Sequence, residues 1–248
     1  MAFHDHFSSR APLYARARPD YPPALFRALA AMAPARSLAW DAGTGNGQAA
    51  VGLAEHFEHV EATEPSTAQL AEARPHPRVS YRVAGAEASG LAGASVDLVT
   101  AAQAAHWFPL EQFYAEVRRV LRPRGILAVW CYGLTRITPP IDAVVDHFYH
   151  QVVGAFWPPE RRHIESGFQH LPFPFREQPF PAVAMRCDWA LPAFLDYLGT
   201  WSAVSRYREH HGSDPLPALA AALAGPWGAP ERVRPVTWPL GGRVGTPA

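Results

Sequence analysis

The stretch LAWDAGTGNG at positions 38–47 decides the fold of this 248-residue chain. It begins as a short apolar run that stops at a carboxylate, Asp41, and continues into three glycines at alternate positions. Apolar residues at helical spacing follow, at Val51, Ala54 and Phe57. Glycines between a strand and a helix permit a tight turn and let a ligand contact the backbone. The stretch therefore predicts a strand, a ligand-binding loop and a helix, with a ligand-free turn as the alternative.

Strands and helices continue to alternate beyond this stretch. A second apolar run ends at Glu64, and Ser66 with Gln69 has the capping-box spacing that starts a helix. An amphipathic helix is expected over 109–121. Further strands are expected over 79–84, 95–101, 126–130, 183–189 and 232–240. Together these elements predict an α/β fold: a doubly wound, Rossmann-like, mostly parallel seven-stranded sheet with helices on both faces.

The character of the sequence changes after residue 133. Apolar residues recur at helical spacing around Ile141, Phe194 and Leu219, and residues 156–181 are rich in Pro, Phe and Arg without a clear period. We therefore expect an inserted cap of helices and aromatic residues after the fifth strand. The glycine-rich segment 241–245 is expected to be loose.

Two carboxylates beside the glycines indicate the charge of the ligand. Asp41 would repel the pyrophosphate of a dinucleotide at the helix N-terminus, and Gln48 occupies the third small position of the dinucleotide pattern G-x-G-x-x-G. S-adenosylmethionine carries a sulfonium and an ammonium group, so a carboxylate attracts it. Glu64 alone would be interpreted as a surface residue, but at the end of a neighbouring strand it can accept hydrogen bonds from both ribose hydroxyls. The pattern favours a cationic, nucleotide-like ligand over a nicotinamide dinucleotide.

Composition excludes several classes of protein. All 22 basic residues are Arg and none is Lys, which excludes a lysine Schiff base and the phosphate-binding loop GxxxxGK[ST]. The 22 acidic residues balance them, so the chain lacks the basic excess typical of nucleic-acid binders. The 12 histidines and the two cysteines, Cys131 and Cys187, show no metal-ligand spacing, and no metal site is expected.

The motifs resemble those of class I S-adenosylmethionine-dependent methyltransferases. The matching segments, in order, are 38–47 (the first motif), 63–66 (the ribose-binding motif), 85–87 (the segment against the adenine), 95–107 (the fourth motif) and 121–127 (the turn into the fifth strand). The N-terminal pattern over 7–22, together with 103–107 and 200–202, is similar to the small-molecule subgroup that includes trans-aconitate methyltransferases. The substrate-facing region 133–230 matches more loosely.

This resemblance implies roles for particular residues and a division of the chain. The implied cofactor-binding residues are Asp41, Gly43, Thr44, Gly45, Glu64, Ala86, Glu87 and Gln103, with Tyr14 and Arg18 on a lid that closes over S-adenosylmethionine. A single domain is expected, divided into 1–36 (N-terminal lid and helix), 37–132 (cofactor-binding core), 133–230 (substrate cap, helices and a late strand) and 231–248 (last strand and tail).

Methyl transfer is an in-line displacement, so the enzyme's main task is to align the reactants in a dry pocket. A carboxylate acceptor is already ionised, whereas a phenol, amine or alcohol needs a general base. His106 is the base candidate, with a role as pocket wall equally open, and Trp107 is expected to pack against ligand or lid. Arg161, Arg162 and Arg206 could clamp an acceptor carboxylate, although exposed arginines are the commoner explanation.

The sequence thus predicts a methyltransferase acting on a small-molecule acceptor, with a carboxylate oxygen among the candidate targets. The rival hypothesis is a catalytically silent module that binds S-adenosylmethionine and methylates nothing. No nucleic-acid partner is expected, because the chain has no basic excess. No membrane partner is expected, because no apolar run reaches the roughly 18 residues that cross a bilayer. A cytoplasmic location is expected, since no signal peptide is visible. The choice between monomer and homodimer is left open.

Overall fold

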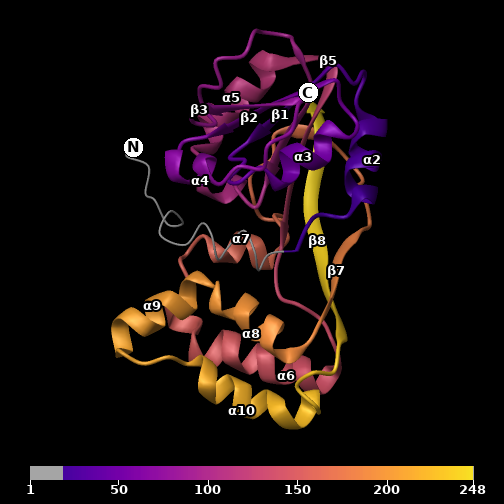
Figure 1. Cartoon of the computed structure of the whole chain (residues 1–248). Coiled ribbons are helices and arrows are strands. Elements are labelled where there is room, and N and C mark those ends of the chain that lie inside the picture. Colours follow the sequence, from indigo (N-terminus) through magenta and orange to yellow (C-terminus); the bar gives the residue numbers. More distant parts are fainter. Residues whose placement is uncertain (1–18, 248) are drawn as a thin grey trace.

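The computed structural model describes residues 19–247 (Figure 1). Its strands are β1 (Leu38–Ala42), β2 (His59–Glu64), β3 (Val79–Val83), β4 (Val96–Ala102), β5 (Leu121–Tyr132), β6 (Phe175–Gln178), β7 (Ala184–Trp189) and β8 (Arg234–Pro247). Its α-helices are α2 (Pro23–Met32), α3 (Gln48–Ala54), α4 (Thr67–Ala71), α5 (Leu110–Val120), α6 (Pro139–His147), α7 (Arg161–Glu165), α8 (Leu191–Gly199), α9 (Ser202–His211) and α10 (Leu216–Trp227). Three short helical turns are η2 (Ala105–Trp107), η3 (Phe148–Val152) and η4 (Gly154–Phe156).

The described strands form one sheet of eight strands. Its order is β3-β2-β1-β4-β5-β8-β6, and β7 pairs with β8 off this path. Strands β1 to β5 are parallel, whereas β8 runs antiparallel to β5, β6 and β7. The predicted Rossmann-like, mostly parallel sheet is confirmed, with eight strands instead of seven. The chain order reverses at β1, which lies between β2 and β4, and α/β sheets bind ligands at such a switch point.

Helices cover both faces of the sheet, as predicted. Successive side chains of a strand point to opposite faces, so β5 contributes to two separate cores. Trp130 lies in the core beneath α2 and α3, with its ring centroid 6.5 Å from that of Phe26. Val129 lies in the core beneath α5, together with Phe113. This burial on both faces explains why the sequence of β5 is continuously apolar from Ile126 onward.

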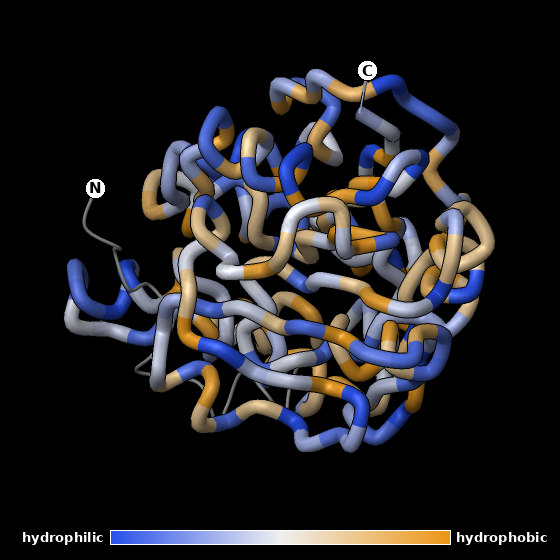
Figure 2. The backbone as a smooth tube through the Cα atoms, turned by 90° about the horizontal axis from the view of Figure 1, so that it is seen from above, coloured by the Kyte–Doolittle hydropathy of each residue, from blue (hydrophilic) through white to orange (hydrophobic). Residues whose placement is uncertain are grey.

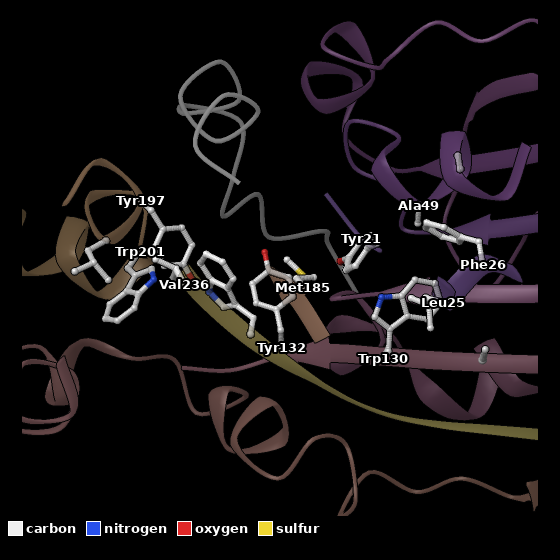
Figure 3. Close-up of a cluster of buried hydrophobic side chains, with 14 of the residues drawn as sticks. Tyr21, Leu25, Phe26, Ala49, Trp130, Tyr132, Met185, Tyr197, Trp201 and Val236 are labelled. Atoms are coloured by element: carbon white, nitrogen blue, oxygen red, sulfur yellow. Dashed lines mark hydrogen bonds between the residues drawn. The ribbon is translucent and has the colours of Figure 1, made fainter. Parts of the chain in front are cut away.

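The cap consists of α6, α8, α9 and α10, in the lower half of Figure 1, and the long strand β8 runs from the sheet into it. Figure 3 shows Trp130, Tyr132, Met185, Tyr197 and Trp201 in a row between the two parts. These side chains belong to one buried cluster, so sheet and cap share a continuous core. Seen from above, polar residues colour many of the outer loops (Figure 2).

The expectation of a loose segment at 241–245 is wrong, because these residues lie within β8 and pair with β5. Their glycines serve close packing. A β-carbon added at Gly241 would lie 2.7 Å from Cα of Gly167, and one at Gly242 would lie 2.6 Å from the carbonyl oxygen of Val129. Glycine in a strand can thus mark a close approach of another backbone.

Other element boundaries also differ from the sequence prediction. β5 begins at Leu121, five residues before the predicted Ile126, because Leu121 pairs with Val96 across a register shift. β6 lies inside the segment 156–181, where no strand was predicted, and it pairs with the end of β8. No helix occurs between β3 and β4, which are joined by turns and loops over 84–95.

Candidate active site

Asp41 lies near the end of β1, two residues before the first glycine of the loop. Its side chain is fully buried, and its two carboxylate oxygens accept hydrogen bonds from the hydroxyls of Thr44 (2.6 Å) and Thr100 (2.7 Å). Burial raises the pKa of Asp41 from 3.8 to about 6, the two threonine hydrogen bonds oppose this rise, and the charge of Glu64 adds to it. A positively charged ligand nearby would stabilise the ionised form, so the site is suited to a cation.

The loop between β1 and α3 has no room for a side chain at Gly43 or Gly47. Gly43, Gly45 and Gly47 have φ angles of 65°, 57° and 84°, in the left-handed region that side chains disfavour. A β-carbon at Gly43 would lie 2.8 Å from both Cβ of Ala104 and Cζ of Phe108. Glycine is therefore required at position 43 by conformation and by space, and the loop presents its backbone at the switch point of the sheet.

Glu64 connects the end of β2 to the same loop. It is buried, and its carboxylate accepts hydrogen bonds from the backbone N–H of Gly45 and of Ser66, both at 3.0 Å. A carboxylate has about four lone-pair positions, so these oxygens can also accept hydrogen bonds from ribose hydroxyls. Ser66 then caps α4 by accepting from the N–H of Gln69, as the sequence predicts. Asp41 and Glu64 thus flank one loop.

Ala86 and Glu87 lie in the loop after β3. Ala86 is buried in the core beneath α5, whereas Glu87 is exposed and its carboxylate lies next to Gly85. A β-carbon on Gly85 would lie 2.7 Å from both Glu87 oxygens. Of the two residues predicted to lie along the adenine, Ala86 is therefore buried in the protein and Glu87 is exposed to solvent.

Gln103 follows β4 and joins it to β5. Its φ of 55° lies in the left-handed region, which is uncommon for a residue with a side chain. Its N–H donates to the carbonyl oxygen of Trp130 at 2.8 Å, and its Nε2 donates to that of Tyr132 at 3.0 Å. The side-chain amide that the resemblance assigns to the cofactor is therefore also used to hold the ends of two strands together.

His106 and Trp107 lie in η2, with ring centroids 4.7 Å apart. The ring of His106 is 5.7 Å from that of Phe168, and its Nδ1 is buried with no hydrogen-bond partner among residues 19–247. Burial, together with the charges of Arg161 and His163, lowers the pKa of His106 to about 3. His106 is therefore neutral at neutral pH. Tyr14 and Arg18, the predicted lid residues, lie outside the described residues.

Sequence reasoning missed residues that complete the site. Thr100 donates a hydrogen bond to Asp41, and its sequence signal was a hydroxyl within a buried, mostly apolar strand. Tyr81 covers Gly47, where an added β-carbon would lie 2.2 Å from its hydroxyl oxygen. Burial and the charge of Asp41 raise the pKa of Tyr81 to about 12. No local pattern links Tyr81 to the loop, because strand pairing brings them together.

Across residues 19–247 the structure shows no group of three or more His, Cys, Asp or Glu side chains that could hold a metal ion. Over the same residues, no helix is both long enough and apolar enough to cross a membrane.

Comparisons with known proteins agree with this site. A methyltransferase domain family matches residues 40–129. A methyltransferase-family protein of Dictyostelium discoideum is 35% identical over 225 residues, which cover 89% of this chain and 86% of the relative. The structure described as a type II methyltransferase from Anaeromyxobacter dehalogenans is 54% identical, with a TM-score of 0.89 over 93% of this chain and 99% of that one. The chain belongs to the class I S-adenosylmethionine-dependent methyltransferases, a family of enzymes.

A more distant structure matches in fold alone. It is phosphoethanolamine N-methyltransferase 2 of Haemonchus contortus, solved with S-adenosylhomocysteine, at 17% identity and a TM-score of 0.50 over 100% of this chain and 61% of that one. Members of this fold family generally bind S-adenosylmethionine, and the buried Asp41 and the tight glycine loop fit such a cofactor.

Proposed function

We propose that this enzyme transfers a methyl group from S-adenosylmethionine to a small-molecule acceptor, with a carboxylate oxygen as the favoured target. The observation that carries the proposal is the pair of buried carboxylates, Asp41 and Glu64, on either side of a loop that has no space for a side chain at Gly43. When bound, the cofactor supplies a methyl group on a positively charged sulfur. The chain supplies the groups that bind and orient it.

The cofactor roles follow from charge and burial. Asp41 would hold the cationic end, because a buried carboxylate gains most from a positive neighbour. Glu64 would accept the ribose hydroxyls, and the backbone of Gly43, Thr44 and Gly45 would approach the ligand closely. Ala86 and Glu87 would lie along the adenine, with Gln103, Tyr14 and Arg18 closing the site, as the family resemblance implies.

The state of His106 favours an acceptor that needs no base. A histidine whose pKa is about 3 binds a proton weakly at neutral pH and is a poor general base there. A carboxylate acceptor is already ionised and can attack the methyl group directly once it is aligned. In this proposal, His106 and Trp107 form the wall that aligns the acceptor and excludes water. Similarity to the trans-aconitate subgroup supports the same substrate class.

The proposal extends to partners and location. The zero net charge favours a small molecule over nucleic acid, since phosphate contacts supply most nucleic-acid affinity. It includes no membrane partner, leaves monomer and homodimer open, and assumes the cytoplasm as the compartment of reaction.

Calorimetric titration tests the cofactor. S-adenosylmethionine should bind to the wild type and more weakly to Asp41→Ala, while NADH should give no signal. NADH binding, or binding of neither ligand, overturns the proposal.

Transfer of a radiolabelled methyl group tests the acceptor. Small carboxylic acids should be methylated and their amides should not, and the rate constant at saturating cofactor should not change between pH 7 and 8.5. Cofactor binding without transfer to any acceptor would instead indicate a silent binding module. A rate that rises with pH in the wild type but not in His106→Asn would give His106 the role of a base.

A further inference from the structure

A cavity of about 380 Å³ lies where the sheet meets the cap. Its lining includes Cys131 near the end of β5, Gly133 directly after β5, Gly241 of β8 and Ile164 of α7. This volume lies within the range of small-molecule sites, which are about 300–1,000 Å³. The cavity is partly apolar, and its polar residues are Arg136, Tyr149, His150, Arg161 and Glu165.

Arg161 is held in a fixed orientation beside this cavity. Its Nε donates to the hydroxyl oxygen of Tyr149 at 2.7 Å, and that hydroxyl donates to Glu165 Oε1 at 2.7 Å. Its guanidinium carbon lies 4.4 Å from the ring centroid of Trp157 and 5.3 Å from that of Tyr149. Two aromatic rings and one hydrogen bond therefore orient the planar group before any ligand arrives.

The remaining donors of Arg161 are uncommitted within the described chain. Among residues 19–247, no acceptor forms a hydrogen bond with Nη1 or Nη2 of Arg161, and no carboxylate lies within 4 Å of its nitrogens. The second arginine of the cavity differs, because Nη1 of Arg136 donates to Asp146 Oδ1 at 3.0 Å. The fork of a guanidinium matches the two oxygens of a carboxylate. Arg161 is thus a half-buried, oriented cation that has no carboxylate partner among residues 19–247.

The short turn η2 links Arg161 to the glycine loop. On one side of η2, Ala104 and Phe108 lie against Gly43. On the other side, the ring of His106 contacts Phe168, three residues after α7, and the charge of Arg161 acts on His106. The cavity is lined by Ile164, Glu165 and Gly167, so a molecule in it would lie close to η2, whose flanking residues contact the glycine loop.

We propose that this cavity binds the methyl acceptor and that Arg161 selects acceptors carrying a carboxylate. This inference rests on the proposed methyl transfer and adds the place and the residue that determine specificity. Of the other two candidate clamps, Arg162 is exposed, and Nη1 of Arg206 donates to the carbonyl oxygen of Phe156 at 3.5 Å. A carboxylate fits better than a doubly charged phosphate, because Glu165 lines the same cavity and repels the second charge.

Binding of two acids and their amides tests this inference on the full chain with S-adenosylhomocysteine present. Ligand-observed NMR titration would measure benzoate against benzamide, and succinate against succinamide. The acids should bind more tightly than the amides to the wild type. Arg161→Gln should weaken acid binding by about 10- to 100-fold, the loss expected for charge-assisted hydrogen bonds. Arg161→Lys should keep part of the preference, and the exposed neighbour variant Arg162→Gln should keep all of it.

Three outcomes would overturn the inference: equal binding of acids and amides by the wild type, binding of none of the four, or unchanged acid binding by Arg161→Gln. A thermal melt and the Arg161→Lys variant separate lost recognition from lost folding. Titration with S-adenosylhomocysteine separates the two proposals. If the wild type does not bind S-adenosylhomocysteine, the proposed function fails. If Arg161→Gln binds both S-adenosylhomocysteine and the acids as the wild type does, only this inference fails.

Discussion

The carboxylate of Glu64 accepts a hydrogen bond of 3.0 Å from the backbone N–H of Gly45, although 19 residues separate them. This bond fixes the glycine loop of β1 to the end of β2 before a ligand binds. A preorganised loop loses less conformational freedom on binding than a mobile one. Glu64 thus has a structural task in addition to the proposed contact with the ribose.

Replacing Glu64 by alanine should weaken cofactor binding without unfolding the chain. The variant loses the loop anchor and the ribose acceptor, and charge-assisted hydrogen bonds of this kind contribute about 1.5–3 kcal/mol. We expect the dissociation constant of S-adenosylhomocysteine to rise roughly 10- to 100-fold, measured by calorimetry. Glu72→Ala, on the exposed C-terminal side of α4, is the control and should bind normally. Equal affinity of both variants would remove Glu64 from the site.

Cofactor affinity should depend on pH through Asp41. Its pKa is about 6, and only the ionised form attracts a cation. The dissociation constant of S-adenosylmethionine should therefore fall as pH rises from 5 to 7 and then level off. Calorimetry across this range would measure the change, and Asp41→Asn should abolish it. A pH dependence that persists in this variant would point to another group.

The same residue should reduce the stability of the ligand-free protein. The pKa of Asp41 rises from 3.8 to about 6 on folding, so the folded state retains a proton that the unfolded state loses. Stability contributed by this group therefore decreases between about pH 4 and pH 6, by roughly 3 kcal/mol in all.

The free energy of unfolding of Asp41→Asn, measured with urea at pH 7.5, should therefore exceed that of the wild type by about 1–3 kcal/mol. This gain in stability should shrink at pH 5. A loss of stability at both pH values would show that the threonine hydrogen bonds outweigh the cost of burial.

Two glycine substitutions should have opposite effects. Gly43→Ala places a β-carbon 2.8 Å from Ala104 and Phe108 at a positive φ, so it should displace η2 and abolish detectable cofactor binding. Gly225→Ala, within α10, meets no atom within 4 Å and should stabilise the chain by about 0.5–1 kcal/mol. Thermal melts and calorimetry on both variants would measure these effects. Normal binding by Gly43→Ala would mean that the loop tolerates a side chain.

Local sequence patterns predicted the sheet region well, because they reflect neighbours along the chain. The apolar run before Asp41, the glycines after it and the cap at Ser66 each specify an element within a few residues. The segment 241–245 was misinterpreted for the same reason. Its glycines allow close contact with Gly167 and Val129, which are far away in sequence and invisible to a local pattern.

The sequence by itself determined the order of strands and helices up to β5 and the chemical types that flank the loop, since spacing and composition encode them. Only the tertiary structure decided which hydroxyl holds Asp41, which tyrosine covers Gly47 and which arginine lies near His106. Thr100 is 59 residues from Asp41, and the pairing of β1 with β4 brings them together. Such contacts depend on the lateral order of strands and on the packing of the cap. Neither is encoded in the periodicity of any single segment.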